Sequence, residues 1–199
     1  SPIKHSSAEN TLAETLSNLW NWFYNIFQAQ ILPGLGYTLL LGQLAMAAAA
    51  IVALASFPLI TRHVVRSKSL RQVSDMGLIT IRCIPELLLA FIALLVLGPS
   101  LIPGIIALGL HNGAIIAHLL GQHGNEVKLR LDVQHRLRSK LSLLFYDVIP
   151  RIYGQFLAFT LYRGETILRE TAILGILGIP TLGFFIDSAF EEFRYDRAL

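Results

Sequence analysis

The sequence predicts an all-α protein, built as a multi-pass bundle of helices in a membrane. Composition is the first reason: 54% of the 199 residues are hydrophobic and 15% are charged, against about 25% charged in an average soluble domain. A mean hydropathy of +0.58 agrees. The second reason is the order of segments, because long uncharged runs alternate with short basic ones. That alternation is typical of membrane helices joined by cytoplasmic loops.

Residues 1–34 are expected to form a polar start and an amphipathic helix. Thr11 and Glu14 have the spacing of a capping box, so the helix is predicted to begin there. Apolar residues then recur every three or four positions up to Ile31, with tryptophan and tyrosine among them. We expect this helix to lie in the membrane interface, although packing on the protein itself is the alternative. Pro33 and Gly34 are predicted to end it.

The remainder, residues 35–199, is expected to be one transmembrane domain. Residues 37–60 carry no charge, and a membrane helix needs about 20 apolar residues. The middle of this first span is rich in alanine, which favours close helix packing in lipid. The following segment, residues 61–72, contains Arg62, Arg66, Lys68 and Arg71, so we place it in the cytoplasm. In this context a nucleic-acid partner is not expected.

A second span is predicted over residues 73–97, kinked at Pro85 because proline removes a backbone hydrogen bond. Arg82 and Glu86 are four residues apart and so share one helix face, where they can pair. Ionisable residues at membrane depth are functional candidates by default. A role in transport, structural pairing, and simple extension toward the cytoplasmic surface all remain open for these two.

The third span is predicted over residues 101–120 and is interrupted by His111, Asn112 and His118. Two histidines without a neighbouring carboxylate or cysteine are weak evidence for a metal, so no metal site is expected. Lining a pathway or hydrogen bonding between helices is the stronger interpretation. Residues 122–149 are again basic and, two spans after the first basic loop, must lie on the same side. Their many leucines predict a helical docking surface rather than a linker, or a loop that packs on its own bundle.

A fourth span begins near Val148 and carries four charged residues, Arg163, Glu165, Arg169 and Glu170. Counting helical rise from Ile149 places them in the outer half of the membrane or at its edge. Two interpretations are open: the charges line a transport pathway or gate, or they form salt bridges that fix the helix. After Gly175 and Gly178 we expect irregular chain.

Three segments, residues 80–86, 97–115 and 156–178, resemble the phosphonate-type permease subunits of binding-protein-dependent ABC importers. Those subunits have the methionine-permease-like transmembrane fold, and the resemblance covers about residues 35–197. It implies import of a phosphonate, phosphate or related oxyanion across the bacterial inner membrane. The expected transport-pathway or gate residues are those named above: Arg82, Glu86, His111, Asn112, Arg163, Glu165, Arg169 and Glu170.

The resemblance also implies partners: a cytoplasmic ABC ATPase dimer, a second permease copy or a paralogue, a periplasmic solute-binding protein, and membrane lipid. ATP and Mg would be bound by the ATPases, and no cofactor is expected on this chain, which lacks a GxxxxGK[ST] phosphate loop. The coupling helix would fall at about residues 125–140, with Asp132, Arg136, Arg138, Ser139 and Lys140 as the ATPase-coupling residues.

Two departures from the family pattern stand out. In the coupling segment Leu131, Asp132, Val133 and Leu137 occupy the usual Glu-Ala-Ala and glycine positions, and the chain is expected to lack a final span. The resemblance implies a non-catalytic subunit. A membrane-embedded hydrolase and a membrane scaffold without transport are the alternatives; the sequence contains neither HExxH nor GxSxG.

Overall fold

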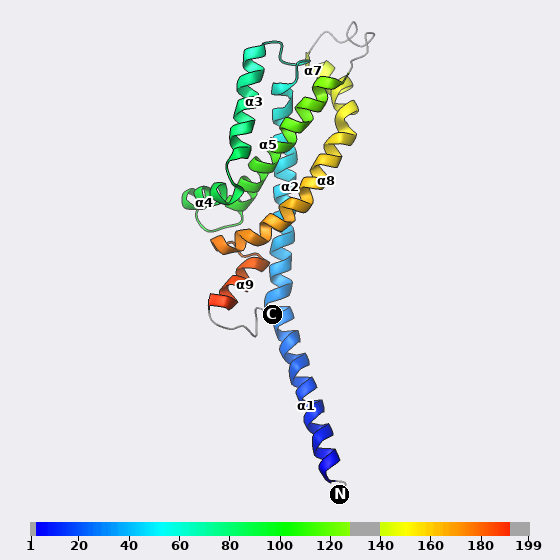
Figure 1. The fold of residues 1–199 in the computed structure, drawn as a ribbon, viewed down its shortest axis with the longest axis vertical. Coiled ribbons are helices and arrows are strands. Elements are labelled where there is room, and N and C mark those ends of the chain that lie inside the picture. The colour runs from blue at the N-terminus through cyan, green and yellow to red at the C-terminus, as the bar shows by residue number, and fades with distance from the viewer. Residues whose placement is uncertain (1–2, 128–139, 192–199) are drawn as a thin grey trace.

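The computed structural model describes residues 3–127 and 140–191 (Figure 1). The elements, in chain order, are α1 (Ile3–Ile26), η1 (Phe27–Ile31), α2 (Leu32–Ile60), α3 (Lys68–Cys83), α4 (Glu86–Leu97), α5 (Ile102–Glu126), α7 (Lys140–Leu143), η2 (Leu144–Val148), α8 (Ile149–Ile173), η3 (Leu174–Leu177) and α9 (Leu182–Glu191). These described ranges contain helices and no strand, which confirms the all-α prediction.

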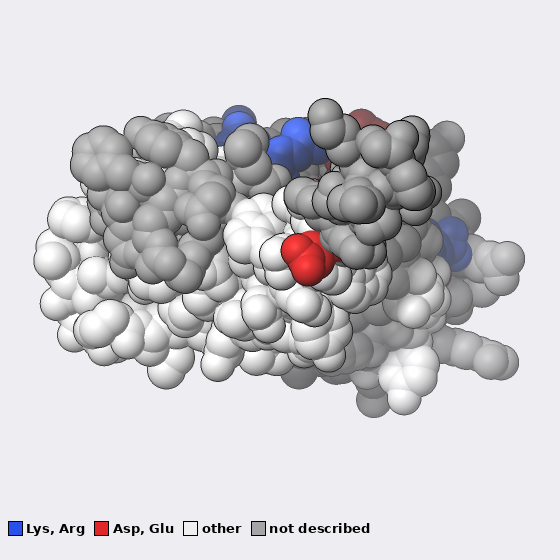
Figure 2. All heavy atoms as spheres, turned by 90° about the horizontal axis from the view of Figure 1, so that it is seen from below, with Lys and Arg blue, Asp and Glu red and all other residues white. Residues whose placement is uncertain are grey.

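Three helical stretches are long and apolar enough to cross a membrane: Glu14–Ile60, Ile102–Glu126 and Leu144–Ser188. A fourth is possible if α3 and α4 together form one broken span. Seen along the long axis from the α1 end, most described side chains are neither acidic nor basic (Figure 2). Both observations fit a helical membrane protein.

The core lies between α2 and α5. On α2 every fourth residue from Leu41 to Phe57 is fully buried, in the order Leu41, Ala45, Ala49, Ala53 and Phe57. Facing them, α5 presents glycines: a Cβ added at Gly109 or Gly113 would lie 2.7 Å from the side chain of Ala48 or Val52. The two backbones are therefore as close as small residues permit, as the alanine-rich sequence predicts for packing in lipid.

Helix α1 does not end at Pro33 and Gly34, so that predicted boundary is wrong. The chain passes from α1 through the π-helical turn η1 into α2, with Pro33 in the first turn of α2. The amide of Leu32 bonds to the carbonyl of Phe27, five residues back. This wider turn makes room for the proline ring, whose missing N–H costs little at the start of a helix. The same arrangement recurs where Ile149 bonds to Leu144 just before Pro150.

The resulting continuous helix from Glu14 to Ile60 has 47 residues. At about 1.5 Å per residue it is about 70 Å long, whereas a bilayer with its headgroups is about 40–45 Å thick. Its N-terminal half carries exposed aromatic residues, among which Trp20, Phe23 and Phe27 have ring centroids 6.4 Å and 6.2 Å apart in succession. The interfacial position of this half stays a prediction.

The predicted kinked span over residues 73–97 is two helices instead of one. Helices α3 and α4 meet at 88°. Because proline disfavours the helical region for the residue before it, Ile84 is extended with a ψ of 126°, and Pro85 follows with a ψ of 138°. Two consecutive extended residues turn the chain far more than the kink a single proline gives inside a helix. Arg82 and Glu86 are thereby separated onto different helices.

The chain after Gly175 is more regular than expected. Gly178 adopts a left-handed conformation with φ of 81°, which only glycine reaches without cost. It reverses the chain into helix α9, so the prediction of irregular structure is wrong for Leu182–Glu191. The amide of Leu182 donates to Thr38 Oγ1 at 2.9 Å, which holds the start of α9 against α2.

The predicted coupling segment, residues 122–149, is described only at its ends. Asp132, Arg136, Arg138 and Ser139 lie outside the described residues, and Lys140 is the first residue of α7. The end of α5 and the start of α7 lie at the same end of the molecule as the turn between α2 and α3 (Figure 1). This arrangement agrees with the prediction that both basic segments share one side.

Candidate functional site

A buried polar cluster lies where α4, α5 and α8 meet. It consists of Glu86, His111, Asn112, Arg163 and Glu170, which come from three helices and are all among the predicted transport-pathway residues. The side chains of Glu86, Arg163 and His111 all lie near the carboxyl group of Glu170. His111 and Asn112 are buried, whereas Glu86, Arg163 and Glu170 are half-buried. We call these five residues the buried polar cluster, after the two buried side chains at its centre.

Asn112 is the centre of this cluster and is fully buried. Its Nδ2 donates to Glu170 Oε2 at 3.1 Å and to the carbonyl of Leu108 at 3.1 Å, while its Oδ1 accepts from Arg163 Nε at 2.8 Å. One amide thus joins a cation and an anion of α8 to α5. A side-chain amide suits this place because it donates and accepts at once.

Glu86 and His111 connect α4 to the same cluster. His111 Nε2 lies 3.8 Å from Glu86 Oε2, and the His111 side chain is buried. Among the described residues Nδ1 of His111 has no hydrogen-bond partner. Glu86 opens α4 directly after Pro85, and a carboxylate at a helix start is favoured by the helix dipole. The bend between α3 and α4 therefore places Glu86 next to His111 of α5.

The charge balance of the cluster decides what it can do. It holds two carboxylates, Glu86 and Glu170, and one guanidinium, Arg163, so its net charge is negative when His111 is neutral. Such a group would repel an oxyanion at short range. Buried, hydrogen-bonded charges of opposite sign instead hold their helices together, and removing one partner leaves the other uncompensated.

The other predicted pathway residues do not join this cluster. Arg169 Nη2 contacts Glu165 Oε1 at 2.8 Å, and their side chains are 73% and 72% exposed. Arg82 is half-buried, and within the described ranges it forms neither a hydrogen bond nor an ion pair. The suggested pairing of Arg82 with Glu86 is therefore wrong, because the 88° bend separates the two helices and Glu86 faces His111 instead.

Two close pairs of polar side chains were not identified in the sequence analysis. Asp147 and Arg151 lie 2.7 Å apart at a spacing of four, a signal the sequence does contain. Asp75 and His118 are 2.6 Å apart across helices, and nothing in the sequence links positions so distant. In the part of the chain that the structure describes, no three His, Cys, Asp or Glu side chains come together as a metal site would require.

Comparison with known proteins places this chain beside transport permeases, although no family model matches it. It is 28% identical to a putative phosphite transport system permease protein of Stutzerimonas stutzeri over 60% of this chain and 46% of that protein. It is 28% identical to a phosphate-import permease protein of Mycolicibacterium smegmatis over 81% of this chain and 31% of that protein. A phosphite transport system permease protein of Stutzerimonas stutzeri is 24% identical, over 59% and 43%.

The chain thus spans less than half the length of the curated relatives it matches. Among solved structures it is similar to a chain in the crystal structure of an amino acid ABC transporter with histidines. The TM-score is 0.68 at 20% identity, covering 92% of this chain and 86% of that one. The chain therefore has the fold of that ABC transporter chain, and the predicted resemblance to phosphonate-type permeases is confirmed by the phosphite and phosphate permease relatives.

Proposed function

We propose that this chain is the transmembrane permease subunit of an ABC importer that carries a phosphonate, phosphate or related phosphorus oxyanion across the bacterial inner membrane. The observation that carries the proposal is the sequence similarity to permease proteins of phosphite and phosphate transport, over 59% to 81% of this chain. The shared fold supports the transporter class without indicating the substrate.

The partners follow from that class. Two cytoplasmic ATPase subunits bind ATP and Mg, a second permease copy or a paralogue completes the membrane part, and a periplasmic protein delivers the oxyanion. The segment around Asp132, Arg136 and Arg138 passes the motion of the ATPases to the membrane helices, which then switch access from one side to the other.

In this function the buried polar cluster holds α4, α5 and α8 in one arrangement. Its two carboxyl groups against one guanidinium support a role in helix contacts over a role in attracting the anion. Breaking the contacts of Asn112 would then accompany the switch of access. Selection of the oxyanion falls mainly to the periplasmic protein.

The test is uptake by the whole complex in proteoliposomes, with the ATPases inside and the binding protein outside. We expect ATP-dependent accumulation of labelled phosphate, phosphite or methylphosphonate, and none of sulfate. The double variant R136E/R138E should keep ATP hydrolysis while losing uptake, since both positions belong to the predicted coupling segment. Absence of uptake for all three phosphorus oxyanions would refute the proposal.

A further inference from the structure

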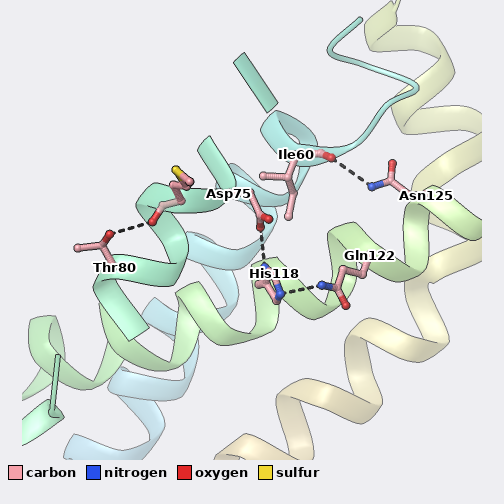
Figure 3. A network of polar contacts seen from close by, with 7 residues as sticks. Ile60, Asp75, Thr80, His118, Gln122 and Asn125 are labelled. Atoms are coloured by element: carbon pink, nitrogen blue, oxygen red, sulfur yellow. Dashed lines mark hydrogen bonds and ion pairs between the residues drawn. The ribbon is translucent and has the colours of Figure 1, made fainter. Parts of the chain in front are cut away.

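A second polar network joins α2, α3 and α5 at the end of the molecule where the α2–α3 turn lies. It consists of Asp75, His118, Gln122 and Asn125, together with the backbone of Ile60 and Arg62 (Figure 3). We call it the basic-end network, after the arginines of the adjoining turn. None of its side chains is part of the buried polar cluster.

Asn125, near the end of α5, bridges to the end of α2. Its Nδ2 donates to the carbonyl of Ile60 at 3.2 Å, and its Oδ1 accepts from the amide of Arg62 at 2.7 Å. The last carbonyls of a helix lack partners within the helix, so Asn125 satisfies one of them. Both polar atoms of its amide are used, and both contacts are to backbone. The contacts therefore persist whatever side chains the turn carries.

His118 makes the corresponding connection to α3. Its Nδ1 lies 2.6 Å from Asp75 Oδ1, and its Nε2 lies 2.7 Å from the amide nitrogen of Gln122. An Nδ1–H that donates to Asp75 leaves Nε2 free to accept from Gln122. Among the residues that the structure describes, Thr80 in the same view bonds only to the carbonyl of Met76 within its own helix (Figure 3).

Packing reinforces these bonds. A Cβ at Gly121 would collide with the side chain of Ile60, so α5 and the end of α2 touch without a gap. The carbonyl groups of Gly124 and Val127 lie near the ring of His63 in the α2–α3 turn. The part of α5 from His118 to its end is thus bonded to both helices that meet at the turn.

From this geometry we infer that Asn125 and the Asp75–His118 pair are positioning residues for transport, which make the end of α2 and the middle of α3 follow α5 whenever α5 is displaced. The chain leaves α5 directly into the predicted coupling segment. On the other side α3 leads through Pro85 to Glu86 of the buried polar cluster. A displacement at the coupling segment therefore reaches the cluster along α5 itself, which carries His111 and Asn112, and also through α3, which leads to Glu86. The inference rests on the proposed function.

The first test replaces Asn125 with leucine, N125L, in the reconstituted complex. ATP hydrolysis should continue, while the oxyanion imported per ATP hydrolysed should fall about tenfold, because two hydrogen bonds of ordinary strength correspond to roughly that factor in an equilibrium. The control is T80V, which removes a hydrogen bond inside α3 and should leave the ratio unchanged. An unchanged ratio in N125L, or uptake and hydrolysis that fall together, would overturn the inference.

The second test ties the two helix ends covalently. A Cβ at Gly124 would lie 3.8 Å from Cγ2 and Oγ1 of Thr61, so cysteines at these two positions face each other and are the pair to test for a disulfide. In a C83S background, the oxidised T61C/G124C complex should import normally, and the disulfide should restore the ratio in N125L. Loss of import on oxidation, regained on reduction, would show that the ends must separate and would contradict the inference.

The two proposals fail differently. If the wild-type complex imports no phosphorus oxyanion, the proposed function is wrong whatever Asn125 does. If the wild type imports and N125L does not assemble, the oxidised T61C/G124C complex alone decides, because it leaves Asn125 in place. A third variant, D75N, keeps the size of Asp75 and removes its charge, and should lower the imported oxyanion per ATP by a smaller factor than N125L.

Discussion

Helix α8 carries two charge pairs that differ in what surrounds them. Glu165 and Arg169 are four residues apart, touch each other directly and are mostly exposed. Arg163 and Glu170 are seven apart and meet on Asn112 of a different helix. A spacing of four makes a contact that needs no other element, whereas a spacing of seven places both charges on the face that packs against α5. Two pairs of oppositely charged residues on the same helix therefore have different roles.

The energetic contrast follows from burial. Exposed ion pairs contribute about 0–1 kcal/mol, since water already solvates both partners. Arg163 and Glu170 are half-buried and keep only part of that solvation, so removing their shared partner costs more than removing one member of an exposed pair. Variants of the two pairs should therefore differ widely.

The largest effect is expected for N112L. It leaves both Arg163 and Glu170 without their shared amide, so we expect a loss of about 2–5 kcal/mol. Thermal unfolding of the detergent-solubilised protein measures it. The control is T160V on α8, because Thr160 Oγ1 is buried and has no partner among the described residues. Equal melting temperatures for N112L and wild type would contradict the central role of Asn112.

An intermediate and asymmetric effect is expected for the two charges themselves. R163Q leaves Glu86 and Glu170 without a cation, whereas E170Q brings the cluster closer to neutrality and keeps an oxygen and a nitrogen near Asn112. R163Q should therefore destabilise by about 1–3 kcal/mol more than E170Q. Thermal unfolding of both variants at one pH gives the comparison, and a larger loss for E170Q would reverse our account of the charge balance.

A small effect is expected for the exposed pair. The double variant E165Q/R169Q should change stability by less than about 1 kcal/mol and should leave uptake in proteoliposomes unaltered. The unchanged buried cluster in the same protein is the internal control. A marked loss of uptake without a loss of assembly would indicate that Arg169 guides the anion, which is the other interpretation of these charges.

The smallest effect concerns His63, which lies in the turn outside the spans. Burial, and then the neighbouring Arg62, lower the pKa of His63 from its ordinary value of 6.5. The folded state therefore prefers the neutral ring, so stability is full above pH 6.5 and falls as the pH drops through the lowered pKa. The melting temperature should decrease slightly from pH 7.5 to pH 5, and by less in H63Q. If the melting temperature of H63Q decreases by the same amount, the pH dependence comes from groups other than His63.

Much of this architecture could be predicted from the chain. Uncharged runs and basic segments gave the membrane class and the spans of α2, α5 and α8, because lipid leaves few alternatives to helices. Small residues correctly indicated close packing of α2 and α5. The polar residues of α5 and α8 were also recognised as candidates, since charge at membrane depth is rare and costly.

Other features depended on contacts that no local pattern encodes. Pro33 follows a π-helical turn and stays inside a helix, whereas Pro85 separates two helices at 88°. Before Pro33 the backbone forms a π-helical turn, whereas before Pro85 it is extended at Ile84. The local sequence does not distinguish these two conformations. Because the helix is interrupted at Pro85, Glu86 pairs with His111. The assumption of one continuous helix over residues 82–86 had suggested Arg82 as its partner instead.

The sequence by itself determined that this chain is a helical membrane protein with basic segments on one side and charged residues in two of its spans. The tertiary structure decided which charges meet. Composition and periodicity act over a few turns, so they assign a residue to a helix and a face. Asn112 reaches Glu170 across 58 positions and Asn125 reaches Ile60 across 65, and such contacts exist only once the helices have packed.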